Sequence, residues 1–308
     1  MVFHVEHMDR LIFVFHVKQF LLTVIVRRTT LVPSDQPARL VHMTETTATV
    51  PVQGRIVAVA NQKGGVGKTT TAINLATSIA LSGRRVLLVD VDPQGNLTSG
   101  VGSKGERTDA GTVYDALLTD AAPDRFVLPT KIENLWLMPA DRNLTGAEIE
   151  MVALPEREHR LKRVLDPLRA QYEYLFVDCP PSLGLLTLNA LVAADAVLIP
   201  LHCEYFALEG LADLVGTMRR VRGGLNPALD IEGVLLTMYD DRTNLGQLVA
   251  RDVREFFKEK VFNTIIPRNV RLGEAPSHGV PGVLYDAKSR GAAAYVALAK
   301  EMLARRAA

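Results

Sequence analysis

Short apolar runs alternate with segments of helical periodicity over most of the chain. The runs are rich in Val, Ile and Leu, which is typical of strands buried on both faces of a sheet. Between the runs, apolar residues recur at spacings of three and four positions, which predicts amphipathic helices. Predicted strands cover residues 55–60, 86–89, 135–138, 174–177, 196–199 and 231–238. Predicted helices cover residues 70–81, 156–170, 185–193, 208–221, 245–257 and 291–306.

This alternation predicts an α/β fold, with a doubly wound, mostly parallel sheet flanked by helices. Ligands of such sheets bind at the carboxyl ends of the strands. The residues that directly follow predicted strands are therefore the first candidates for chemistry.

A glycine-rich loop follows the first predicted strand and leads into a predicted helix. Its glycines let backbone N–H groups surround a phosphate, and the helix N-terminus adds its dipole. Lys68 is placed to reach the β- and γ-phosphates, and the Thr69 hydroxyl is placed to ligate Mg²⁺. The predicted nucleotide-binding residues of this loop are Lys63, Gly64, Gly65, Val66, Gly67, Lys68, Thr69 and Thr70.

The loop departs from the common phosphate-loop pattern at one position. Gln62 stands where that pattern has glycine, and Lys63 follows it. This form resembles the deviant Walker A loop of the ParA/MinD branch of P-loop ATPases. The resemblance implies ATP and Mg²⁺ as cofactors, and a nucleotide-sandwich dimer in which Lys63 reaches the partner's phosphates. A cation supplied in this way would stabilise the charge that develops during phosphoryl transfer.

Aspartates end two other predicted strands. Asp178 follows an apolar run in the Walker B arrangement, which predicts that it holds Mg²⁺ through water. Asp92 lies in an Asp-Pro-Gln-Gly-Asn turn, and the resemblance gives it the role of the hydrolytic aspartate. Asp90 is predicted to be structural. The predicted catalytic residues are Lys63, Lys68 and Asp92.

The resemblance covers most of residues 54–303. Segments that look like chromosomal ParA, also called Soj, are 89–96, 237–246, 264–279 and 285–291. Members of that family bind ATP, dimerise and then bind DNA without sequence preference, and the partner ParB stimulates hydrolysis and releases them. The resemblance implies that Pro267 and Asn269 contact adenine, and that the protein is cytoplasmic and nucleoid-associated.

Charge is balanced over the whole chain but not along it. The 308 residues include 35 Lys and Arg against 34 Asp and Glu, which excludes a nucleic-acid binder that works by bulk charge. Residues 239–308 have a balance of +4, and the remaining chain has a balance of −3. Phosphate contacts need cations and no base-reading element, so this basic part predicts nonspecific DNA binding. The candidates are Arg242, Arg268, Arg271 and Arg290, of which the resemblance favours Arg242 and Arg271.

The first 50 residues differ from the rest of the chain. Residues 11–26 are hydrophobic, but the run is shorter than a membrane-spanning helix and includes Lys18. We therefore expect neither export nor a membrane anchor. Residues 33–51 are rich in Pro, Thr and Ser, which is typical of a linker or of disorder. The chain divides into an extension, 1–50, and a ParA-type ATPase domain, 51–308.

A short repeat favours a second interpretation of the extension. Residues 2–7 recur in similar form at residues 14–19. Codons for Phe-His-Val-Lys can form a DNA palindrome, and the longer codon run resembles parS, the DNA site that ParB binds. Under this hypothesis, residues 1–42 are translated upstream DNA and Met43 is the true start.

Three other functions stay open at this stage. A MinD-like ATPase that positions cell division at the membrane would carry a basic amphipathic C-terminal helix, and we expect none beyond the last predicted helix. An electron-transfer ATPase of the nitrogenase-iron-protein kind needs cluster-ligating cysteines, and Cys179 and Cys203 lack that placement. A non-enzymatic scaffold would bind nucleotide without turnover. The favoured function is a ParA-type ATPase that forms an ATP-dependent homodimer and drives chromosome segregation.

Overall fold

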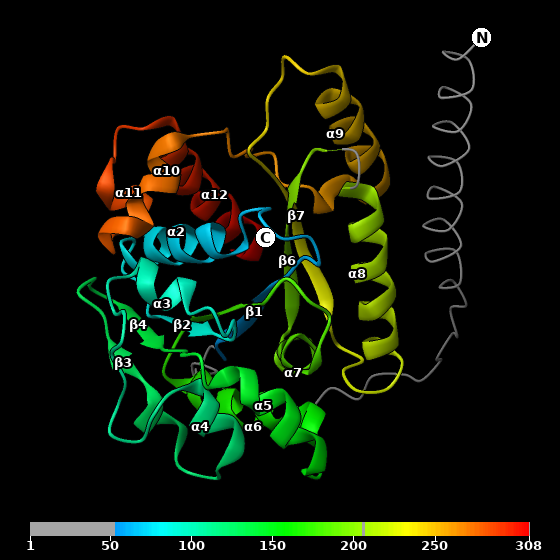
Figure 1. The fold of residues 1–308 in the computed structure, drawn as a ribbon. Coiled ribbons are helices and arrows are strands. Elements are labelled where there is room, and N and C mark those ends of the chain that lie inside the picture. The colour runs from blue at the N-terminus through cyan, green and yellow to red at the C-terminus, as the bar shows by residue number, and fades with distance from the viewer. Residues whose placement is uncertain (1–52, 205–206, 308) are drawn as a thin grey trace, which may run out of the picture. The chain divides into compact units, whose positions relative to one another are not determined.

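A seven-stranded sheet organises the residues that the computed structural model describes, which are 53–204 and 207–307 (Figure 1). The strands lie in the order β3-β4-β2-β5-β1-β6-β7. All neighbours are parallel except β3 and β4, which confirms the predicted mostly parallel sheet. The strands are β1 Arg55–Val59, β2 Val86–Asp90, β3 Leu128–Pro129, β4 Leu135–Met138, β5 Tyr174–Asp178, β6 Ala196–His202 and β7 Asp230–Thr237.

Helices cover both faces of the sheet, as the strand–helix alternation predicts. Helices α2 and α12 lie on one face, and α7 and α8 lie on the other (Figure 1). The helices are α2 Lys68–Ala80, α3 Asn96–Gly100, α4 Val113–Leu118, α5 Leu144–Glu150, α6 Arg160–Leu165, α7 Leu185–Ala193, α8 Ala207–Arg222, α9 Asn244–Phe257, α10 Val270–Glu274, α11 Gly282–Tyr285 and α12 Arg290–Ala307.

The main hydrophobic core lies between the sheet and the pair α2 and α12. Val57 and Val59 point into it from β1, and Ile73 and Leu298 meet them from the two helices, all at most 2% exposed. Every residue of β2 and β5 is buried, which explains why these strands read as continuous apolar runs. The core therefore fixes the central strands whose carboxyl ends carry the candidate site.

One predicted helix was wrong as a single element. Residues 156–170 form α6 flanked by two 3₁₀ segments, Arg157–His159 and Asp166–Ala170. Pro167 has no N–H to continue an α-helix, and Glu156 has a φ of 50°, outside the helical region. The segment therefore turns twice where its apolar spacing predicts one straight helix.

The extension falls outside the described residues. Contacts divide the chain into Met1–Pro51 and Val52–Ala308, and only the second unit is described here by its elements. The predicted disorder, the repeat and the proposed start at Met43 all concern the first unit and stay predictions.

Arg169 ties together the amino-terminal ends of β1 and β6. Its guanidinium donates to Asp195 through Nη1 (2.7 Å) and Nη2 (3.0 Å), and to the Gly54 carbonyl oxygen (2.8 Å). Asp195 in turn accepts from the Ile56 amide (2.8 Å). The Arg169 side chain is 9% exposed, so this network lies in a region where an unpaired charge is costly.

We predict that Arg169→Ala lowers the free energy of unfolding by about 3 kcal/mol, because the buried Gly54 carbonyl oxygen and the partly exposed Asp195 both lose a charged donor. Arg84→Ala is the matched control, since Arg84 pairs with Glu173 at the surface and its loss should cost less than about 1 kcal/mol. Urea unfolding of the nucleotide-free protein measures both changes. Equal effects of the two substitutions would contradict this role of Arg169.

Candidate active site

The register of β5 brings three strand ends together. In the ladder with β1, Asp178 pairs with Val59, the last residue of the strand that leads into the glycine-rich loop. In the ladder with β2, Asp178 pairs with Asp90. The loop, Asp178 and the turn after β2 therefore meet at one edge of the sheet, as the sequence predicts.

Two glycines give the loop its shape. Gly65 has a φ of 71° and Gly67 a φ of 86°, conformations that other residues seldom adopt. Gly67 is the N-cap of α2, which therefore begins at Lys68, two residues before its predicted start. The Thr237 hydroxyl at the end of β7 donates to the Val66 carbonyl oxygen (2.8 Å) and fixes the loop from the other side.

Lys68 lies inside this loop. Its side chain is buried, and Nζ donates to the Lys63 carbonyl oxygen (3.2 Å). Burial lowers the pKa of Lys68, while the negative charges of Asp178 and Asp92 oppose that change. A buried ammonium group between a phosphate loop and two carboxyls is suited to bind the oxygens of a polyphosphate.

Asp178 is a fully buried carboxyl without a hydrogen-bond partner among the described residues. Burial, followed by the nearby Asp90, raises its pKa well above the usual value, and Thr69 and Lys68 oppose this rise. Two orphaned carboxyl oxygens beside a threonine hydroxyl fit a hard cation that prefers oxygen ligands, such as Mg²⁺. The residues present therefore fit the predicted metal.

Asp90 and Asp92 have different surroundings. Asp90 is fully buried and accepts from the amide (2.8 Å) and hydroxyl (2.7 Å) of Thr98, although burial still raises its pKa to about 6. Asp92 accepts from the Gln94 amide (3.0 Å) through Oδ1, and the Gly95 amide closes the turn on its carbonyl oxygen (2.9 Å). Asp90 therefore holds the local structure, while the turn leaves Oδ2 of Asp92 without a partner among the described residues.

Lys63 makes an ion pair that the sequence analysis missed. Its Nζ lies 2.5 Å from Oε2 of Glu204, which comes just after β6, and His202 Nδ1 lies 3.1 Å from the other carboxylate oxygen. The hydrogen bond from Lys63 lowers the pKa of Glu204. A signal for Glu204 did exist, since it follows a buried strand at the same edge as Asp92 and Asp178. The Lys63 ammonium group is thus paired with a carboxylate of its own chain.

Pro267 reaches this edge from a later segment, and Asn269 follows it two positions on. Pro267 pairs with Tyr239, two residues beyond the Thr237 that contacts the loop. Asn269 is the N-cap of α10, and its Oδ1 accepts from the Arg271 amide (2.9 Å). The side-chain oxygen of Asn269 therefore already accepts a hydrogen bond, and its Nδ2 remains available to contact a ligand.

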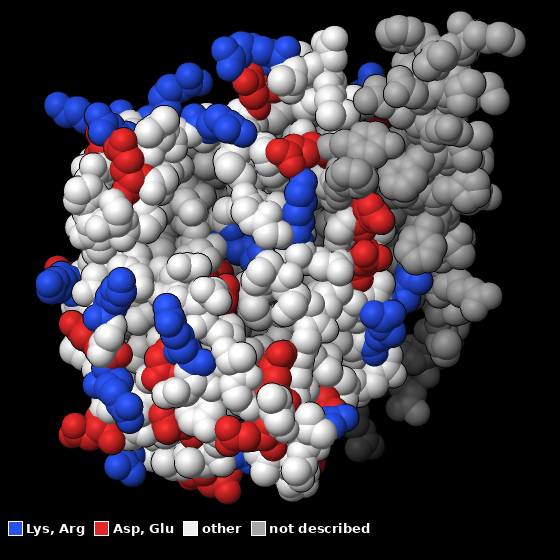
Figure 2. All heavy atoms as spheres, in the orientation of Figure 1, with Lys and Arg blue, Asp and Glu red and all other residues white. Residues whose placement is uncertain are grey.

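The four candidate DNA-binding arginines differ in their partners. Arg242 pairs with Asp240 (2.6 Å) and holds the pKa of that carboxyl well below its usual range, and Arg271 pairs with Glu274 (2.8 Å). Arg268 and Arg290 are exposed and have no ion pair among the described residues. Lys and Arg side chains gather along the upper rim of the face in Figure 2, over α10, α11 and the loop before α9.

A phosphate loop between a buried strand and a helix, with aspartates at neighbouring strand ends, defines a P-loop nucleotide-binding protein. Residues 54–231 match the family described as AAA domain. The chain is 56% identical over 252 residues to chromosome partitioning protein ParA of Myxococcus xanthus, covering 82% of this chain and 89% of that one. It is 57% identical over 252 residues to sporulation initiation inhibitor protein Soj of Bacillus subtilis, covering 82% and 99%. The chain belongs to the ParA/Soj family of chromosome-partitioning ATPases.

A solved structure agrees with the P-loop fold. Cobyrinic acid a,c-diamide synthase from Mycobacterium smegmatis, with bound ADP and magnesium, superposes with a TM-score of 0.72 at 38% identity, over 83% of this chain and 96% of that one. The relatives support the ParA-type function and not the MinD-like alternative. Within the described ranges, no helix has both the length and the apolar character to cross a membrane.

We predict that Asp178→Asn stabilises the nucleotide-free protein by about 1 kcal/mol near pH 8, because a buried unpartnered charge is removed. The raised pKa means that folded Asp178 keeps its proton above pH 3.8, its ordinary value, so the wild type loses stability as pH rises through this range. The gain should therefore shrink toward pH 4. Thermal unfolding measures it, and the same variant should lose most of the shift that Mg²⁺ and ATP add. A destabilised variant at pH 8 would contradict this account.

Proposed function

We propose that the chain is an ATP-hydrolysing ParA-type partitioning protein. ATP and Mg²⁺ convert it to a homodimer, which binds double-stranded DNA without sequence preference. A ParB-type partner stimulates hydrolysis and releases it, and this cycle moves chromosomes on the nucleoid in the cytoplasm. The observation that carries the proposal is the placement of Lys63 within the phosphate loop, with Asp92 and Asp178 at the same sheet edge.

Each side chain at this edge has one proposed task. The loop amides and Lys68 bind the phosphates, and Thr69 and Asp178 hold Mg²⁺, the latter through water. Bound Mg²⁺ would neutralise charge on the β- and γ-phosphates during transfer. Asp92, with one free carboxyl oxygen, orients the attacking water. Pro267 and Asn269 contact adenine.

Lys63 acts on the partner's nucleotide. In one protomer its ammonium group is paired with Glu204, so this ion pair must break before Lys63 can cross a dimer interface. The pair is partly exposed, with side-chain exposures of 31% and 48%, so its loss is cheap compared with new contacts to a triphosphate. Lys63 can therefore pair with Glu204 in the monomer and contact the partner's phosphates in the dimer.

The surface that carries Arg242, Arg268, Arg271 and Arg290, which we call the arginine rim, supports DNA binding. Arg268 and Arg290 are free to contact phosphates, whereas Arg242 and Arg271 must exchange a carboxylate for a phosphate. Because both of these pairs lie at the surface, the exchange costs little. The binding should therefore depend strongly on salt and little on sequence.

The experiment that tests the function is Asp92→Ala in the full chain. The variant should bind ATP and dimerise, hydrolyse ATP at least tenfold more slowly with DNA and ParB present, and stay on DNA. Hydrolysis is followed by phosphate release, and DNA residence by interferometry after a wash without ATP. Unchanged turnover would exclude Asp92 from catalysis, and DNA binding independent of ATP in the wild type would contradict the cycle.

Glu204→Gln should favour the dimer, because Lys63 no longer leaves an ion pair. Two exposed pairs break per dimer, each worth up to about 1 kcal/mol, so dimerisation should tighten by up to about thirtyfold. Glu209→Gln is the control, since it removes an exposed carboxylate on α8 that has no ion pair among the described residues. Sedimentation with a slowly hydrolysed ATP analogue measures both. A weaker dimer in Glu204→Gln would show that Glu204 supports the dimer instead.

Arg271→Glu should weaken DNA binding at least tenfold, because it reverses a charge on the rim, while ATP-dependent dimerisation stays the same. Arg219→Glu makes the same charge change at an exposed position of α8 and should alter DNA affinity by less than twofold. Fluorescence anisotropy with a duplex at several salt concentrations measures the affinity. Equal losses in the two variants would point to net charge and not to the rim.

A further inference from the structure

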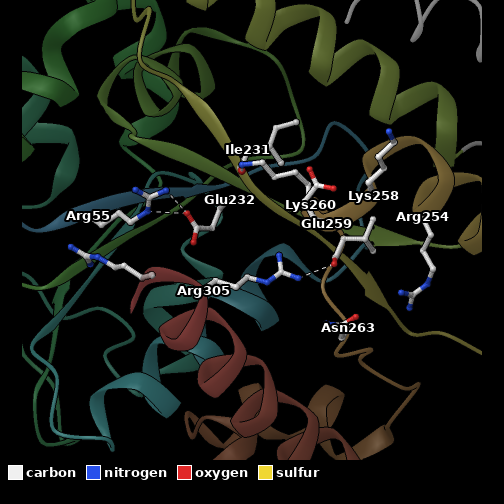
Figure 3. Close-up of a pocket in the computed structure, with 11 residues that line it drawn as sticks. Arg55, Ile231, Glu232, Arg254, Lys258, Glu259, Lys260, Asn263 and Arg305 are labelled. Atoms are coloured by element: carbon white, nitrogen blue, oxygen red, sulfur yellow. Dashed lines mark hydrogen bonds and ion pairs between the residues drawn. The ribbon is translucent and has the colours of Figure 1, made fainter. Parts of the chain in front are cut away.

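A hollow lies at the opposite end of the sheet from the phosphate loop. It has a volume of about 840 Å³ and is bordered by the first residues of β1 and β7, the end of α9 and the end of α12 (Figure 3). Six cationic side chains line it: Arg55, Arg254, Lys258, Lys260, Arg305 and Arg306. The acidic side chains in its wall are Glu232 and Glu259. The hollow is therefore basic and separate from the nucleotide site.

Three of the six cations are neutralised by carboxylates. The pairs are Arg55 with Glu232 (2.6 Å), Lys260 with Asp230 (2.9 Å) and Arg305 with Glu301 (2.7 Å). These pairs hold the wall in place. Arg305 is held further, because it lies over the Phe262 ring and donates to the Val261 carbonyl oxygen. They account for the shape of the hollow but not for its charge.

The other three cations have no carboxylate partner among the described residues. Arg254 and Lys258 make no ion pair there, and Arg306 donates only to the backbone carbonyls of Glu173 (3.2 Å) and Gln53 (3.4 Å). Of the two carboxylates that line the hollow, Glu259 has no ion pair among the described residues. The unpaired side chains of the wall are therefore three cations and one anion. Like charges that line a concave surface raise its potential and attract anions.

Lys258 is also held in an unusual backbone conformation. Its φ is 49° and its ψ is −122°, a region that a side chain other than glycine's seldom adopts. It is the residue at which α9 stops and the 3₁₀ segment Lys258–Lys260 begins. Strained residues of this kind cluster at ligand sites, where the surrounding structure holds them in position.

The shape and chemistry of the hollow favour one class of ligand. Its volume lies in the range of small-molecule sites, and a concave site of this size does not admit a DNA duplex. Planar guanidinium groups match phosphate oxygens in pairs, and an ammonium group adds a point charge. No aromatic side chain is among the lining residues, so the site offers no ring on which a base could stack.

We propose that this hollow is a binding site for a small, non-aromatic anion that carries two or more phosphate groups. Arg254, Lys258 and Arg306 bind its phosphates, while Arg55 and Arg305 remain paired in the wall. The site is independent of the nucleotide, because it lies at the amino-terminal ends of β1 and β7 and the phosphate loop meets their carboxyl ends.

The test uses inorganic tripolyphosphate and the full chain, with ADP in excess to fill the phosphate loop and no added Mg²⁺. Calorimetry should show one tripolyphosphate per chain. Arg254→Ala with Lys258→Ala should weaken binding at least tenfold. The matched control, Arg251→Ala with Lys300→Ala, removes two exposed cations outside the hollow, one on α9 and one on α12, and should change affinity less than twofold. Thermal unfolding verifies that both double variants fold.

Three results would overturn the proposal. They are no binding of tripolyphosphate by the wild type, equal losses in the two double variants, and a loss of DNA binding in Arg254→Ala with Lys258→Ala while tripolyphosphate affinity is kept. The last result would make the hollow part of the DNA surface. The tripolyphosphate measurements need neither ATP hydrolysis nor dimerisation, so their failure leaves the partitioning function untouched, and the reverse also holds. The DNA measurement alone uses the ATP-bound dimer.

Discussion

The parallel pairing of β5 with both β1 and β2 is the constraint on which the rest of the site depends. One residue, Asp178, is the ladder partner of Val59 on one side and of Asp90 on the other. This register places the phosphate loop, the carboxyl proposed to hold Mg²⁺ and the turn that carries Asp92 at one edge. A shift of one residue would turn Asp178 to the other face of the sheet, away from the loop.

Two charged groups at this edge have few partners in the nucleotide-free fold, and a third is held in a surface ion pair. Among the described residues, Asp178 is buried without a hydrogen-bond partner and Lys68 donates to one backbone carbonyl, while Lys63 is paired with the partly exposed Glu204. Under the proposed function, Asp178 and Lys68 gain partners when a magnesium-bound triphosphate fills the loop, and Lys63 exchanges Glu204 for the partner's phosphates. The poorly partnered groups lower the stability of the nucleotide-free protein, and bound nucleotide would raise it again. Such a local loss of stability is the expected pattern at a functional site.

Sequence patterns predicted the elements that long apolar runs define, and the residues that follow them. β1, β2, β5 and the phosphate loop were predicted because burial on both faces and special glycine conformations leave strong local signals. The five-residue helix α10 and the two-residue strand β3 are too short for periodicity to show. The Lys63–Glu204 pair was missed because its members are 141 positions apart and meet only through sheet topology. The hollow at the other end depends likewise on distant segments meeting.

The most direct measurement of the central claim is the mass of the wild-type protein in solution with Mg²⁺ and a slowly hydrolysed ATP analogue, compared with Lys63→Ala. The account predicts a dimer for the wild type, a monomer for both proteins without nucleotide, and weaker dimerisation or weaker subsequent hydrolysis for Lys63→Ala. A wild-type protein that stays monomeric with bound analogue at every concentration would contradict the account.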